Sequence, residues 1–165
     1  MMSDQCDFIT SETIKKSPLG TELSLEQCEK LAEKVKPLCL EEGYFLFEEG
    51  NTDEALYVIA SGALEVVKPA GNDDWITLHL LKEGDITGEL GFIDQRPHSA
   101  SVRALSNTEI YSLSRESLES FLQTDPEIVY KVMRAIILVV HQILSQMNLQ
   151  HVEVSNYISK QHGRY

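Results

Sequence analysis

The chain has 165 residues, 42% of them hydrophobic and 24% charged, which is enough apolar material for one core and excludes wholesale disorder. Its net charge of −12 repels phosphate backbones and anionic lipid heads, so we expect no direct binding to DNA and none to a membrane. Three cysteines without a CxxC pair predict neither a disulfide framework nor a zinc site, and no basic leader or apolar run of ~20 residues is present, so a cytoplasmic location is expected.

The N-terminal part of the chain divides into an arm and a helix. Residues 1–21 are polar and aperiodic, and we interpret them as a flexible N-terminal arm. Ser24 with Gln27 three positions later forms a capping-box pattern, which marks the start of a helix. Apolar residues then recur at helical spacing up to Val35, and Pro37 follows. One short amphipathic helix is predicted here.

From Leu38 to Leu113 the sequence consists of short apolar runs separated by glycines, which is typical of strands and turns. The predicted strands are residues 44–47, 55–60, 64–67, 75–81, 101–104 and 109–113. This spacing leaves no room for crossover helices. It therefore predicts a β-sandwich, a jelly roll or a barrel.

After Ser114 the helical period returns. A short helix is predicted around Leu118 and Phe121, and the sequence Thr124-Asp125-Pro126 marks the start of a long one. The long helix is apolar around much of its circumference, so it must be covered on more than one side. We expect one face to pack on the β domain and another on the same helix of a second copy. The alternative is a helix buried within one monomer.

The stretch of residues 84–104 carries the most chemistry. Gly88 and Gly91 bracket Glu89 and Leu90, which allows a tight turn into a short helix whose backbone N–H groups can face an anion. The Glu89 carboxylate could accept hydrogen bonds from a sugar, and the Ser99 hydroxyl could donate to a phosphate. Taken alone, glycine turns of this kind in β proteins are usually only turns.

The order of these residues resembles the phosphate-binding cassette of the cyclic nucleotide-binding domain family, in which G-E-L is followed some eight residues later by R-[SA]-A. The match continues upstream through Glu42-Gly43, Glu49-Gly50, Leu56-Tyr57-Val58-Ile59, Ser61-Gly62 and Gly84-Asp85. The resemblance covers roughly residues 24 to 147. It implies a mainly β fold with flanking helices, a double-stranded β-helix (jelly roll or β-roll), followed by the long C-terminal dimerisation helix of catabolite-activator-type regulators.

The resemblance divides the chain into four parts. These are the flexible arm 1–21, a cyclic nucleotide-binding-like β-roll with short helices at 22–124, a long C-terminal helix at 125–160 and a tail at 161–165.

One departure from the family pattern concerns charge. Family members that bind cyclic AMP or cyclic GMP use an arginine to neutralise the phosphate, and the matching position here is His98. Loss of a bidentate guanidinium contact costs on the order of 1.5–3 kcal/mol, or ~10- to 100-fold in affinity. A histidine is mostly neutral at pH 7 unless the ligand favours its protonation. Arg96 and Arg103 are other candidate cations, which we interpret as surface charges.

A second departure is that only about 18 residues follow Met147, too few for a helix-turn-helix, so we expect any output to pass through a separate effector protein or the dimer. Five scattered histidines and the absence of a nucleophile-elbow motif predict no enzyme, no metal site and no cofactor beyond a possible cyclic nucleotide.

The leading hypothesis is a stand-alone, homodimeric regulatory or sensor domain that binds a cyclic nucleotide (cAMP or cGMP) weakly. It assigns the ribose and phosphate turn and the phosphate side to Gly88, Glu89, Leu90, Gly91, His98, Ser99 and Ala100. The alternative is a degenerate, non-binding domain that acts as a homodimeric protein-interaction scaffold. A third hypothesis is a different anionic ligand. An open concave site would favour sensing, and a cassette filled by its own side chains would favour the scaffold.

Overall fold

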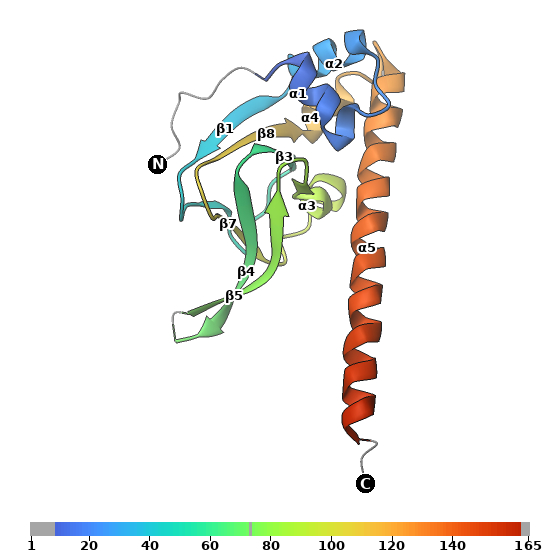
Figure 1. The fold of residues 1–165 in the computed structure, drawn as a ribbon. Coiled ribbons are helices and arrows are strands. Elements are labelled where there is room, and N and C mark those ends of the chain that lie inside the picture. Colours follow the sequence, from blue (N-terminus) through green and yellow to red (C-terminus); the bar gives the residue numbers. More distant parts are fainter. Residues whose placement is uncertain (1–8, 73, 163–165) are drawn as a thin grey trace.

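The computed structural model describes residues 9–72 and 74–162, and beyond Leu149 it describes side chains only at Val152 and Tyr157. Within these residues, eight strands form two antiparallel four-stranded sheets (Figure 1). In order, the first sheet contains β1 (Lys36–Leu40), β8 (Thr108–Ser114), β3 (Ala55–Ser61) and β6 (Ile86–Thr87). The second contains β2 (Phe45–Phe47), β7 (Ser101–Ala104), β4 (Ala63–Gly71) and β5 (Asp74–Lys82). This confirms the predicted fold class, a mainly β fold of the double-stranded β-helix (jelly-roll) type with flanking helices. The strands β1 and β6 were not predicted.

Alternation along the strands builds two cores. In β3, Leu56 and Val58 point toward the helices, whereas Ile59 points into the space between the sheets. The core between the sheets also contains Phe47 and Leu81. The first sheet is therefore apolar on both faces, and the helices must cover the face that the second sheet leaves open.

In the described part of the chain, six helices accompany the strands, five of them short. The short ones are α1 (Ser11–Lys16), the 3-10 turn η1 (Pro18–Gly20), α2 (Leu25–Ala32), α3 (Glu89–Asp94) and α4 (Arg115–Glu119). The long one is α5 (Pro126–His162). In Figure 1, α1, α2 and α4 gather at the end of the roll where α5 begins. The capping box is present: the Ser24 hydroxyl accepts the Gln27 N–H and the Gln27 side chain accepts the Ser24 N–H, both at 3.1 Å.

The flexible arm predicted at residues 1–21 is wrong for its described part, residues 9–21. Two helical segments form there, and Ile14 and Leu19 are fully buried in the helical core. The prediction failed because two isolated apolar residues in a polar stretch carry no period, although both belong to the buried cluster that also contains α2 and α5 side chains. Residues 1–8 lie outside the described part of the chain, as does the end of the predicted tail, residues 163–165.

Two of the cysteines are described. Cys28 is a free thiol buried in the helical core, where burial raises its pKa. Cys39, in β1, takes part in a disulfide bond, which the cysteine spacing did not predict.

Helix α5 is packed in its first turns, and its described side chains are largely exposed from Ile137 onward. Ile128, Val132 and Ile136 are fully buried against the helical core, whereas Ile137 and Leu144 are 60% and 54% exposed. By length and composition alone, the segment Pro126–Leu149 could cross a membrane: an 18-residue window within it has a mean hydropathy of 1.6, and 17% of that window is buried. The first turns of this segment are packed on the helical core, as in the core helix of a globular domain.

Candidate functional site

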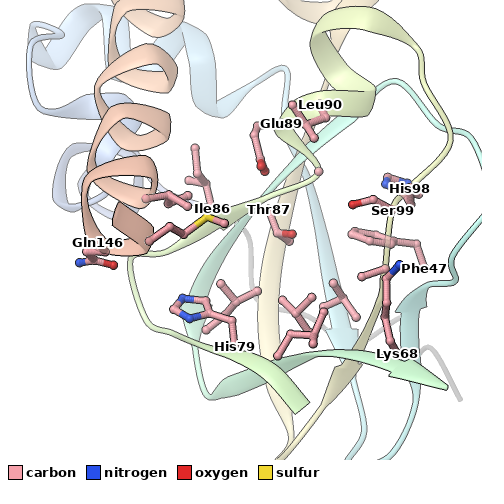
Figure 2. A pocket seen from close by; sticks show the side chains of 18 residues that line it. Phe47, Lys68, His79, Ile86, Thr87, Glu89, Leu90, His98, Ser99 and Gln146 are labelled. Carbon is pink, nitrogen blue, oxygen red and sulfur yellow. The ribbon is translucent and has the colours of Figure 1, made fainter. Parts of the chain in front are cut away.

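A cavity of about 490 Å³ lies between the second sheet, the segment of residues 86–100 and α5. Figure 2 shows Phe47, Lys68, His98 and Ser99 on one side of it, and Ile86, His79 and Gln146 on the other. Glu89 and Leu90 line the cavity from α3, and Thr87 lies between the two sides. The cavity is therefore open space, and the cassette is not filled by its own side chains.

Gly88 makes the turn that places α3 at this cavity. Its φ of +80° lies in the left-handed region, and a Cβ there would lie 2.7 Å from the Ala55 carbonyl oxygen. The other end of α3 is held by Arg115, whose guanidinium donates to the carbonyl oxygens of Phe92 and Ile93. The short helix is thus fixed at both ends to β3 and to the start of α4.

Glu89 is the acidic group of the site. Its side chain points into the cavity (Figure 2). Burial raises its pKa, against the opposing effects of a backbone hydrogen bond and of His98. A carboxylate placed in a half-buried cavity is a strong acceptor for hydroxyl groups, such as those of a sugar, that enter with a ligand.

His98 lines the cavity but is held by neighbouring groups. Its Nε2 lies 3.1 Å from Asp53 Oδ2, and its ring stacks on Phe47 with 3.8 Å between centroids and 14° between planes. Asp53 also accepts from the Tyr57 hydroxyl at 3.0 Å, and burial, followed by the Asp53 charge, raises the Tyr57 pKa. The His98 backbone is fixed as well, because its N–H donates to the Asn51 carbonyl at 2.8 Å.

The contact with Asp53 determines whether the His98 ring can donate a hydrogen bond to an anion in the cavity. With its Nε2–H directed to the Asp53 carboxylate, a neutral imidazole has only a lone pair on the other nitrogen, which repels a phosphate. Only the doubly protonated ring would donate. His98 is therefore a weak replacement for an arginine.

Six of the seven residues predicted from the sequence line the cavity together; they are Gly88, Glu89, Leu90, His98, Ser99 and Ala100. Gly91 does not line it: it is buried behind the cassette, where a Cβ would lie 2.9 Å from the Asp53 carbonyl oxygen. Arg96 points to solvent, 80% exposed and paired with Asp94. Arg103 is bound to Glu65 and is not among the residues that line the cavity.

Other lining residues come from parts of the chain that the sequence did not indicate. They are Phe47, Val66, Lys68, Leu78, His79, Leu81, Ile86, Thr87 and Val102 from the β-roll and Ile143, Gln146 and Met147 from α5. Most are apolar strand residues indistinguishable by pattern from core. Lys68 carried one signal that could have been used, since it is the only basic residue of its strand, β4.

Comparison with known proteins agrees with the geometry. A family model described as the cyclic nucleotide-binding domain matches residues 37–125, more than half of the chain. The CRP-like cAMP-activated global transcriptional regulator of Mycobacterium tuberculosis is 27% identical over 108 residues, which are 64% of this chain and 47% of that protein. The cyclic AMP receptor protein of Thermus thermophilus is 28% identical over 119 residues, which are 72% and 55%. The chain thus spans about half the length of these curated relatives.

Solved structures show the same fold. A cyclic nucleotide-binding domain from Methylobacillus flagellatus superposes with a TM-score of 0.73 at 27% identity, covering 82% of this chain and 76% of that one. The catabolite activator protein of Thermus thermophilus superposes with a TM-score of 0.70 at 26% identity, covering 84% and 63%. On the family match, the cassette sequence and the fold together, the chain belongs to the cyclic nucleotide-binding domain family.

Proposed function

We propose that the chain is a regulatory module that binds a cyclic nucleotide, cAMP or cGMP, weakly in the cavity beside α3. The observation that carries this proposal is an open cavity of about 490 Å³ with the Glu89 carboxylate directed into it. Small-molecule sites typically measure about 300–1,000 Å³, so the space fits a ligand of nucleotide size.

The lining suggests how such a ligand would lie. Glu89 would accept from the ribose hydroxyl, and the phosphate would lie on the side of Ser99 and Ala100. The base would then extend toward the apolar side chain of Ile86, with the amide of Gln146 near its edge. In this arrangement the ligand contacts the roll and α5 at once, which suits a sensor.

Low affinity follows from the state of His98. Because its Nε2 already faces Asp53, the site has no free guanidinium-like group at the position that matches the family arginine. The same observation favours a second candidate function, a domain that has lost its ligand and serves as a protein-interaction scaffold.

We further propose that the module works in the cytoplasm as a homodimer formed through α5 and that it is not an enzyme. It would pass its signal to a separate effector protein rather than bind DNA or a membrane. The family description, a binding domain, supports the non-enzymatic part. The exposed apolar residues of α5 support the dimer.

The test is calorimetric titration of the wild type and of His98→Arg with cAMP and cGMP. We expect micromolar binding by the wild type and roughly 10- to 100-fold tighter binding by the variant, because a guanidinium would restore the charged contact. His141→Arg is the control, since it makes the same substitution at an exposed position of α5 outside the cavity. Binding by the variant alone would mean that the fold is intact but has given up its ligand, which favours the scaffold. No binding by either protein would overturn the ligand site.

A further inference from the structure

We infer that Lys68 supplies the positive charge for the anionic group of the ligand, in place of the cassette arginine. This inference rests on the proposed function. Among the described residues that line the cavity, Lys68 is the only lysine or arginine. The two arginines nearest in sequence to His98 are committed elsewhere, Arg96 to Asp94 at the surface and Arg103 to Glu65.

The strand register places Lys68 at the phosphate side of the cavity. In the antiparallel pair of β4 and β7, Val67 lies opposite Ser101 and Val66 opposite Val102. The next position along both chains puts Lys68 beside Ala100, which with Ser99 completes the cassette. Figure 2 agrees, because the ammonium end of Lys68 points to the side of the cavity that holds Phe47 and Ser99.

The ammonium group is held in this place by a partner that a ligand could displace. Lys68 Nζ lies 3.1 Å from Glu49 Oε1, and the two side chains are 44% and 39% exposed. The Glu49 N–H donates to Ser101 Oγ at 2.9 Å, which anchors the acidic partner at the start of β7. An ion pair as exposed as this adds little stability, so exchanging the carboxylate for a ligand phosphate costs little.

The geometry therefore predicts a competition at this corner of the cavity. Without ligand, Glu49 neutralises Lys68. With ligand, the phosphate takes over the ammonium group, which as a flexible point charge can reach it without the fixed fork geometry that an arginine requires. Removing Lys68 should weaken anionic ligands only, and removing the Glu49 charge should strengthen them.

The experiment compares cAMP with adenosine, which shares the base and the ribose 2′-hydroxyl but carries no phosphate and so no negative charge. Calorimetric titrations are made with the wild type, Lys68→Met, Glu49→Gln and the control Lys82→Met, which removes the same charge from an exposed residue of the neighbouring strand outside the cavity. We expect Lys68→Met to weaken cAMP roughly tenfold and to leave adenosine unchanged. Glu49→Gln should tighten cAMP a few-fold, and Lys82→Met should change neither ligand.

The outcomes separate this inference from the proposed function. If the wild type binds both ligands and Lys68→Met weakens neither, or weakens both alike, the cavity is a ligand site but Lys68 is not its cation. If the wild type binds neither cAMP nor adenosine, the proposed function fails and the role of Lys68 fails with it. Thermal unfolding of each variant checks that the substitutions leave the fold intact.

Discussion

Glu89 illustrates at the scale of one residue how a binding site can cost stability. Burial raises the pKa of this carboxyl in the folded chain, so the folded state holds its proton at a pH where the unfolded state has lost it. Between the ordinary glutamate value and the raised one, the folded state binds more protons, and stability falls as pH rises through that window. Above the raised value the whole cost is present.

We therefore expect Glu89→Gln to increase the free energy of unfolding at pH 7 while weakening both cAMP and adenosine. The gain should shrink as the pH is lowered toward the ordinary glutamate value of 4.5, because the folded wild-type carboxyl takes up its proton before that value is reached. Urea unfolding at a series of pH values measures this. Glu83→Gln, at an exposed position, is the control and should show no such dependence. A variant less stable than the wild type at pH 7 would contradict the argument.

At the scale of elements, one polar group joins the four strands of the second sheet. Arg103 in β7 donates through Nε to Glu65 in β4 at 2.9 Å, and its guanidinium lies over the rings of Phe45 in β2 and Trp75 in β5. Glu65 also accepts from Thr77 of β5 at 2.7 Å. The Thr77 hydrogen bond first, and then Arg103, lowers the Glu65 pKa despite burial.

Arg103→Met should thus destabilise the fold by roughly 2–3 kcal/mol, because it removes two of the three hydrogen bonds to a buried carboxylate and leaves only the one from Thr77. The pH dependence should be opposite in sign to that of Glu89. The lowered pKa of Glu65 stabilises the fold above the ordinary glutamate value, and this contribution is lost as the pH falls through the folded-state value. Urea unfolding of Arg103→Met and of Arg103→Met with Glu65→Leu checks both points. The double variant should recover part of the loss, and an equal or larger loss would refute the pairing.

Local patterns predicted most of the elements but not all of them. The six predicted strands are present because each carries apolar residues at strand spacing between glycine turns, whereas β6 has only Ile86 and Thr87 and exists through its pairing with β3. The cassette residues were predictable because they are contiguous. The tie between His98 and Asp53 was not, since it joins residues 45 positions apart and depends on how the turn after β2 folds back. The position of Lys68 at the cavity was not predictable for the same reason, because only the register of β4 against β7 brings this residue to the cassette.

At the scale of the whole molecule, α5 both lines the cavity and carries exposed apolar residues. Ile143, Gln146 and Met147 line the cavity. Ile137 and Leu144, seven positions apart and therefore on one helix face, are exposed. An apolar helix face open to water favours association with a second copy, and the same helix would then be held from both sides.

We expect the protein to sediment as a dimer at micromolar concentration, and Ile137→Glu with Leu144→Glu to convert it to a monomer, since two charges on that face would have to be buried. Both residues are exposed in the single chain, so the monomer should keep its thermal stability. Leu25→Glu with Leu122→Glu, which alters two exposed apolar residues outside α5, is the matched control and should stay dimeric. A wild type that is monomeric, or a dimer that survives the charges on α5, would contradict this interface. If the interface holds, ligand and dimer should be linked through α5: cAMP should strengthen association by the same factor by which association strengthens cAMP binding, because thermodynamic coupling is reciprocal.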